Sequence, residues 1–249
     1  MIIEDMIDHH PSHPGYTLKE EKIDRLYTCD GCKEVGFGTC YTCTNTACNF
    51  HLHKQCANPV EIISHPFFPK LHFRFLKEGG PNKRCDACGR DINGYVYRCD
   101  KEDLDLHPCC AKLPYYEDVV INEGEKIRLV LKKKVSSKCC KCKEKKLWGE
   151  VKNTWSYVSE NQEVHFHLSC VKDLVCESWR DGWQIEKVDA NWPKPKLEVY
   201  KESKWKGSGR SKFGMLKKVL KIALTFVIAV VIGDPTAMLV GVVTSLITH

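Results

Sequence analysis

The cysteines and histidines of this chain follow a repeated pattern that suits metal binding. Cys-x2-Cys followed by His-x2-Cys occurs three times, and the leading cysteines are 56 and 54 residues apart. Structural zinc takes four Cys or His ligands in a tetrahedron with no open position. Each repeat therefore predicts one closed Cys3His site. The predicted sets are Cys29, Cys32, His53 and Cys56; Cys85, Cys88, His107 and Cys110; and Cys139, Cys142, His167 and Cys170.

Further donors surround the first two repeats. In the first repeat, the spacing predicts a second, interleaved site formed by His13, Cys43, Cys48 and His65, and His10 competes with His13. In the second repeat, only His72 and Cys99 occupy comparable positions, so that site is predicted to be degenerate. The prediction is about four structural zinc ions. The remaining thiols are interpreted as buried small side chains: Cys40, Cys109, Cys140 and Cys176.

The elements that must position these ligands are short. Stretches such as 95–100 and 154–159 are aromatic and β-branched, which favours strands, and a short helix is predicted after each His-x2-Cys, most clearly at 167–179. A repeat of about 55 residues buries little core, so a metal is expected to stabilise it. The predicted fold is therefore small zinc-stabilised α+β modules in tandem. Their predicted bounds are 9–66, 67–120 and 121–190, followed by a basic linker at 191–213 and an apolar helical tail at 214–249.

Cysteine usage and charge indicate the compartment and the partners. Of 16 cysteines, 15 lie between Cys29 and Cys170, and the N-terminus shows no apolar leader. Because no export signal is visible, the chain is expected to be intracellular, with the nucleus left open. In such a reducing compartment, metal binding by the thiols is favoured over disulfides. Residues 126–146 carry a net charge of +9 and residues 201–221 carry +7, so the rest must carry −10 within the total of +6. This distribution argues against a nucleic-acid coat and for local anionic contacts.

The C-terminal tail is a candidate membrane segment. Residues 222–247 form an apolar stretch interrupted by Asp234 and Pro235, long enough to reach across a bilayer that needs about 20 residues. Basic residues before it would be attracted to an anionic cytoplasmic leaflet. The sequence therefore predicts contact of residues 201–249 with an anionic membrane surface. The alternative is a pair of apolar helices that pack on the repeats or on another copy.

The repeats resemble a known family. The string "YTCDGCKEVGFGTCYTC", the later "CNFHLHKQCANP" and "YVYRCDKEDLDLHPCCAKLP" are similar to the divergent C1 domain, a cysteine- and histidine-rich family abundant in plants. The resemblance covers about residues 9–180. It implies a small sheet and a short helix bound by two zinc ions with interleaved ligands. The middle pair departs from the family pattern, because Cys43-x4-Cys48 replaces Cys-x2-Cys.

These features favour a zinc-binding adaptor with protein partners, in signalling or stress response, held near membranes by its tail. A diacylglycerol-type lipid sensor is one alternative, although the Pro and Gln-Gly of lipid-binding C1 modules are missing at matching places. A PHD- or RING-type cross-brace is another, but it would leave His107 and Cys110 without their partners. Closed, thiolate-rich sites and the lack of a nucleophile–base pattern argue against an enzyme.

Overall fold

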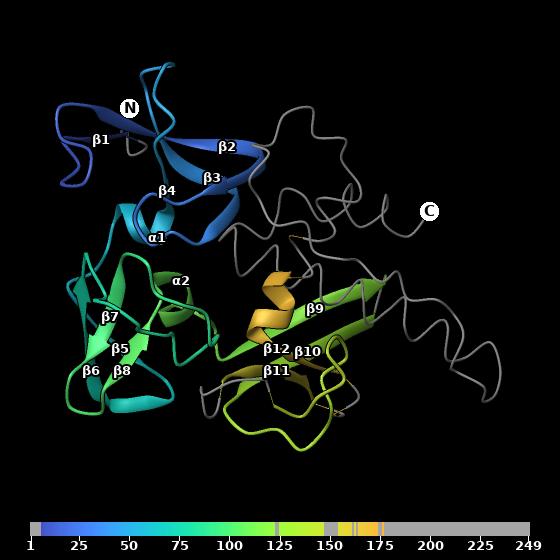
Figure 1. The fold of residues 1–249 in the computed structure, drawn as a ribbon. Coiled ribbons are helices and arrows are strands. Elements are labelled where there is room, and N and C mark those ends of the chain that lie inside the picture. The colour runs from blue at the N-terminus through green and yellow to red at the C-terminus, as the bar shows by residue number, and fades with distance from the viewer. Residues whose placement is uncertain are drawn as a thin grey trace.

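The computed structural model describes residues 6–122, 125–146, 154–160, 162, 164–173 and 176. These residues form three antiparallel sheets of four strands each, which follow one another along the chain (Figure 1). We call the parts that contain them module 1 (residues 6–57), module 2 (62–111) and module 3 (116–173). The tandem of short strands and small helices predicted from the sequence is confirmed. The predicted linker at 191–213 and helical tail at 214–249 lie outside the described residues.

Each sheet is a simple meander that ends at a metal-binding histidine. Most strands are short, and the longest are β2, β3 and β6; the residue bounds of all strands are as follows. Module 1 contains β1 (Met6–Asp8), β2 (Thr17–Thr28), β3 (Val35–Cys43), β4 (His51–His53) and helix α1 (Lys54–Ala57). Module 2 contains β5 (Ile62–His65), β6 (Phe68–Leu76), β7 (Val96–Cys99), β8 (Leu104–Leu106) and α2 (Pro108–Ala111). Module 3 contains β9 (Tyr116–Asn122), β10 (Glu125–Lys132), β11 (Ser156–Ser159) and β12 (His165–His167), and residues 168–173 are helical.

The strand pairing shifts two of the predicted boundaries. β5 pairs with β6, so residues 62–65 belong to the second sheet and not to a first repeat that ends at 66. β9 pairs with β10, so the predicted boundary at 120/121 falls inside a strand of the third sheet. In both cases the strand begins after four intervening residues from the previous module's short helix, and it pairs with the next strand along the chain.

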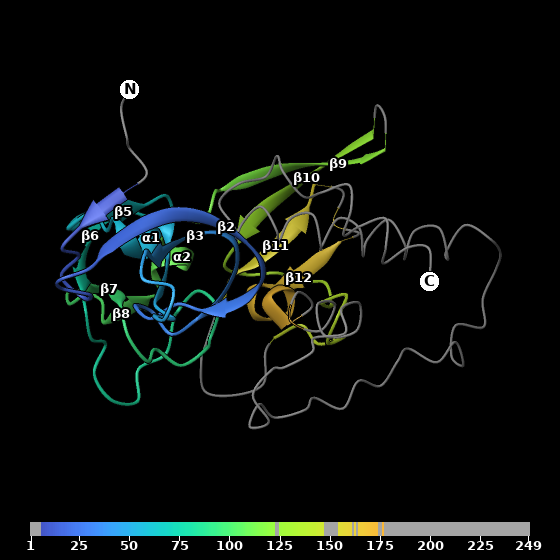
Figure 2. The ribbon, with the colours of Figure 1, turned by 90° about the horizontal axis from the view of Figure 1, so that it is seen from above.

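The hydrophobic core is divided unequally among the modules. Module 1 has its own core around Leu18 and Leu52, to which Tyr95 of module 2 contributes. Modules 2 and 3 share one larger core that includes Phe73 and the fully buried Trp155. Their backbones also meet there, since the Trp155 amide donates to the Ala87 carbonyl at 2.8 Å. Seen from above, modules 2 and 3 lie beside each other (Figure 2), and together they fold around one interior.

Candidate metal centres

Each predicted Cys-x2-Cys forms the same tight backbone loop. The amide of the first cysteine donates to the carbonyl five residues later, at 3.0 Å from Cys29, 2.9 Å from Cys85 and 2.9 Å from Cys139. The residue after the second cysteine has a positive φ, which glycine adopts without strain and other residues adopt at some cost. These residues are Lys33 (φ 63°), Gly89 (φ 75°) and Lys143 (φ 63°). The loop directs both thiols of the pair to one point.

The His-x2-Cys half is positioned by a strand that runs into a helix. In modules 1 and 2 the helix begins directly after the histidine, and Pro108 at the start of α2 has the fixed φ that a first helical residue needs. The histidine amide donates to the sulfur of the leading cysteine at 3.4 Å, from His53 to Cys29 and from His107 to Cys85. Helix and strand thus bring the two halves of each site together.

The imidazole rings have the same orientation in all three sites. Nδ1 faces the second cysteine's sulfur at 3.3 Å for His53, 3.4 Å for His107 and 3.3 Å for His167. Nε2 lies 3.1 Å from the Asp91 carbonyl in module 2 and 3.3 Å from the Lys145 carbonyl in module 3. A ligating histidine typically donates its other ring N–H in this way, which fixes the ring.

The donor sets fit zinc. In each of the three sites, the four donor atoms lie within 4.8 Å of one another, and every ligand is buried except the half-buried Cys142. Three thiols and one imidazole are a donor set that structural zinc prefers. The hydrogen bond between Cys139 and Cys170 lowers the pKa of the Cys139 thiol to about 2 and raises the pKa of the Cys170 thiol, so Cys139 is the member of the pair that carries the thiolate. The structure thus brings together all twelve of the predicted Cys3His ligands.

A fourth cluster lies in module 1, formed by His13, Cys43 and Cys48. His13 Nε2 lies 3.4 Å from Cys48 Sγ. The His13 ring is fixed by stacking, with centroids 4.2 Å from Phe50 and 4.7 Å from Tyr16. The four clusters suit Zn²⁺ and correspond to about four structural ions. His10, the competing residue, is not among the grouped donors, and its Nδ1 accepts from the Ser12 amide at 3.2 Å.

His65, predicted as the fourth ligand of that cluster, lies elsewhere. It ends β5 in the second sheet, with its ring centroid 4.5 Å from that of Trp155, and it is 2% exposed. Its Nδ1 accepts from the Phe67 amide at 3.1 Å. Burial and the charge of Lys133 lower the pKa of His65 to about 4. The prediction failed because the strand that carries His65 belongs to module 2, so the described residues supply three donors to this cluster.

The predicted second site of module 2 is also not assembled. His72 is exposed, and its Nδ1 lies 3.4 Å from Ser64 Oγ, whereas Cys99 is buried in the shared core. Ser159 ends β11 of module 3 as Cys99 ends β7 of module 2. Its hydroxyl accepts a hydrogen bond from the Val164 amide at 2.9 Å. The predicted positions of a second metal site in modules 2 and 3 are therefore occupied by an exposed histidine, a core cysteine and a serine bonded to the backbone.

These geometries can now be compared with known proteins. Two segments match the family model of the C1 domain: residues 8–57 and residues 64–111. Both are C1-like cysteine- and histidine-rich domains. Their limits agree with modules 1 and 2, and module 3 repeats their loop and imidazole geometry. Among the curated proteins and the solved structures, the comparison finds no match to the chain.

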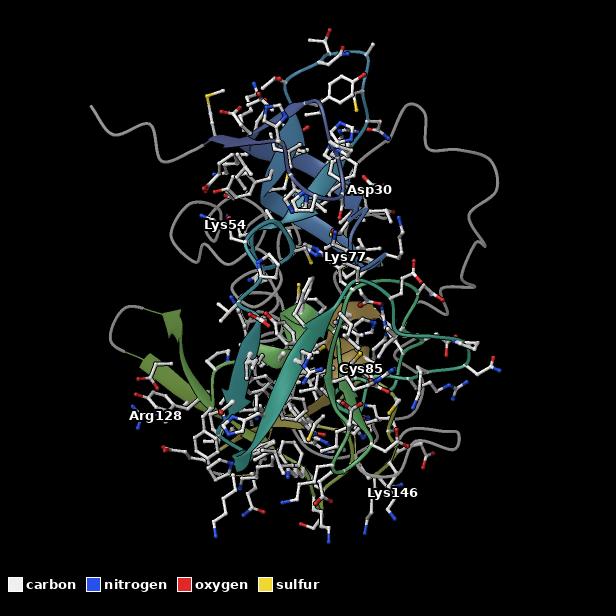
Figure 3. All side chains as sticks on the ribbon, turned by 90° about the vertical axis from the view of Figure 1, so that its left-hand side faces the viewer. Asp30, Lys54, Lys77, Cys85, Arg128 and Lys146 are labelled. Atoms are coloured by element: carbon white, nitrogen blue, oxygen red, sulfur yellow. The ribbon has the colours of Figure 1, made fainter. Side chains whose placement is uncertain are left out.

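The structure adds participants that the sequence pattern does not reveal. Asp30 and Asp86 each follow the first cysteine of their loop (Figure 3 labels Asp30 and Cys85). The Asp30 carboxylate accepts a hydrogen bond from the His51 amide at 2.8 Å, and the Asp86 carboxylate accepts one from the Asp105 amide at 2.7 Å. Cys140 occupies the same position in module 3, where its amide donates to the His165 carbonyl at 2.7 Å. Cys140 therefore links the loop to β12 through its backbone, as Asp30 and Asp86 link their loops to β4 and β8.

Lys172 of module 3 is a second such participant. Its ammonium donates to Cys88 Sγ at 3.8 Å and to Glu34 Oε2 at 2.5 Å. Arg90 joins the same junction through Asp173 at 2.5 Å. One zinc with three thiolates and a neutral imidazole carries a net charge of −1, so a cation beside the site offsets that charge. The partners are 84 and 138 residues away from Lys172 in the sequence, so no local pattern could have indicated it.

Proposed function

We propose that this protein is a non-catalytic, zinc-stabilised interaction protein. The observation that carries the proposal is that three Cys3His sets are closed by four protein donors each. A catalytic zinc site keeps a position for water or substrate, and thiolate-rich, buried sites leave little access. Two hollows on the described surface, about 430 and 380 Å³, are lined without any donor of the four clusters. The metal is thus assigned to holding the modules in shape.

An exposed aromatic surface on module 3 is our candidate for partner contact. Tyr115, directly before module 3, and Tyr116, its first residue, are 50% and 54% exposed, although both are large aromatic side chains. The Arg128 guanidinium lies 4.8 Å from the Tyr116 ring centroid. Tyr116 belongs to β9, which is an edge strand of the third sheet. Tyrosine and arginine are enriched among the residues that dominate protein interfaces. These features support an adaptor that binds a protein partner, and we place it in signalling or stress response.

We further propose that the segment 201–249 holds the protein at the cytoplasmic face of an anionic membrane. The support is its sequence: residues 201–221 carry a net charge of +7 and are followed by apolar residues. Anionic lipid surfaces attract such a basic stretch. Within the part of the chain that the structure describes, no helix is long and apolar enough to cross a membrane. Deletion of 214–249 is expected to abolish binding to vesicles that contain phosphatidylserine, and unchanged binding would contradict this assignment.

Site-specific photo-crosslinking tests the adaptor role. A photoreactive phenylalanine at position 116 of the full chain is expected to form covalent adducts with a defined partner in cells. The same probe at Tyr16, which is 45% exposed on module 1, serves as the matched control. His167→Ala, which removes a zinc ligand of module 3, should abolish the adducts at 116. Adducts that are equal at both positions, or that survive His167→Ala, would contradict the proposed surface.

A further inference from the structure

The short helix at residues 168–173 carries a zinc ligand of module 3 and a charged side chain that reaches module 2. It is the orange helix of Figure 1 and follows His167 directly. Cys170 belongs to the donor set of module 3. Two residues further along the helix, the Lys172 ammonium donates to Cys88 Sγ, a donor of module 2, at 3.8 Å. One helix thus contacts two zinc sites, the first with a ligand and the second with a cation.

The Asp173 carboxylate of the same helix joins the Cys-x2-Cys loops of modules 2 and 3. Its Oδ1 accepts from the Arg90 guanidinium at 2.5 Å, and its Oδ2 lies 3.7 Å from the Lys141 ammonium. Arg90 closes the loop of module 2, because its carbonyl accepts from the Cys85 amide. Lys141 lies between the two ligating cysteines of the loop in module 3. One carboxylate therefore spans the loops of both sites.

Glu34 of module 1 fixes the position of the Lys172 ammonium. Its Oε2 accepts from Lys172 Nζ at 2.5 Å, and neither side chain is more than 14% exposed. The other oxygen, Oε1, lies 3.7 Å from Nε2 of His107, a ligand of module 2. Water screens partly buried charges much less than exposed ones. The ion pair therefore holds the cation beside the zinc site of module 2.

A cation in this position favours the metal-bound form of the site. With zinc bound, three thiolates and a neutral imidazole leave the donor set of module 2 with a net charge of −1. The Lys172 ammonium contacts the sulfur of one of these ligands, Cys88. Opposite charges attract strongly where water screens them poorly. Removal of Lys172 from the junction is therefore expected to weaken zinc binding by module 2.

We propose that zinc binding at the site of module 3 strengthens zinc binding at the site of module 2, with Lys172 as the positioning residue that connects them. When His167 and Cys170 bind a metal together with their loop, the helix that follows is fixed and Lys172 is held at Cys88. Without that metal, Cys170 no longer ties the helix to the loop. Coupling between two binding sites is reciprocal, so metal in module 2 also strengthens binding in module 3. This inference stands independently of the proposed adaptor role.

Site-specific zinc affinities test the proposal in the full chain. The protein is equilibrated with zinc and a competing chelator, a brief pulse of N-ethylmaleimide labels the thiols that hold no metal, and peptide mass spectrometry reports each site. Lys172→Met keeps all twelve Cys3His ligands and should lower the zinc affinity reported by Cys85 and Cys88 about tenfold. Lys172→Arg should restore it, because the cation is kept. Lys134→Met, the matched control at an exposed lysine of module 3, should leave it unchanged, and so should every variant for Cys48 of the fourth cluster.

A double-variant cycle separates this contact from the core that modules 2 and 3 share. His167→Ala removes a ligand of module 3 and should lower the zinc affinity of module 2. In the Lys172→Met background the same change should lower it by a smaller factor, because the contact through which it acts is already lost. An equal factor in both backgrounds would assign the coupling to the core and overturn the proposal. Unchanged affinity in Lys172→Met would also overturn it, even where His167→Ala fails to fold.

Discussion

Module 1 differs from modules 2 and 3 in how it compensates for its small size. Module 1 contains two metal clusters and a core of its own. Modules 2 and 3 contain one cluster each and share a core around Trp155. Cys43, a metal donor of module 1, ends β3, and the residues that end the matching strands are Cys99 in module 2 and Ser159 in module 3. Cys99 is buried in the shared core, and the Ser159 hydroxyl accepts a hydrogen bond from a backbone amide. Shared packing between two small modules thus accompanies the loss of the second ion.

The largest expected effect comes from removing a zinc ligand in either region. A structural zinc site contributes about 10–16 kcal/mol of apparent binding free energy on folding. His107→Ala should therefore unfold module 2 and, through the shared core, expose module 3 as well. His53→Ala should expose residues 6–57 together with the Tyr95 contact of module 2, and it should leave residues 116–173 protected. Hydrogen exchange measured by mass spectrometry checks both variants. Full protection of residues 116–173 in His107→Ala would show that modules 2 and 3 do not depend on a shared core.

The next effect concerns the shared core itself. Trp155 is 1% exposed and lies against His65, Phe67 and Phe68. Trp155→Ala should cost about 3–5 kcal/mol through the cavity it leaves, with faster exchange in modules 2 and 3 together. Leu18→Ala is the matched control in the core of module 1 and should affect that module alone. A Trp155→Ala protein in which only module 3 exchanges faster would show that the two modules fold separately.

The junction that links all three modules should give a smaller effect. Lys172 and Glu34 are 14% and 12% exposed, and their side chains pair at 2.5 Å. Lys172→Met leaves Glu34 and the thiolate of Cys88 without this cation and should cost about 2–3 kcal/mol in denaturant unfolding. The double variant with Glu34→Gln should cost less than the two single changes added together. Strict additivity would show that the pair is not coupled.

The smallest effect is a pH dependence in the shared core. Burial and Lys133 lower the pKa of His65 from 6.5 to about 4. Between pH 6.5 and about 4, His65 is protonated in the unfolded chain but not in the folded protein. The contribution of His65 to the free energy of unfolding is therefore fully present above pH 6.5 and is lost as the pH falls toward 4. Between pH 7 and pH 5 we expect a loss of stability on the order of 2 kcal/mol. His65→Phe should remove this component from the difference between unfolding at pH 7 and pH 5, and an unchanged difference would contradict the assignment.

The sequence predicted the metal ligands better than the surroundings that they share. Spacing alone identified the twelve Cys3His ligands, because both halves of a site come from short local loops. His65 was assigned to module 1 since its distance along the chain fitted, but strand pairing places it in module 2. The contacts of Lys172 with Glu34 and Cys88 are between modules. They depend on how sheets pack, which no spacing pattern in a single repeat encodes. The tail at 214–249 stays a prediction.

The measurement that most directly tests this account is zinc per chain for the full-length protein, by native mass spectrometry, together with a count of free thiols after denaturation. We expect four ions, one for each cluster, and all 16 cysteines reduced. Chelation of the metal should then unfold all three modules. A chain with paired disulfides, or one whose sheets remain protected from hydrogen exchange after every ion is removed, would contradict it.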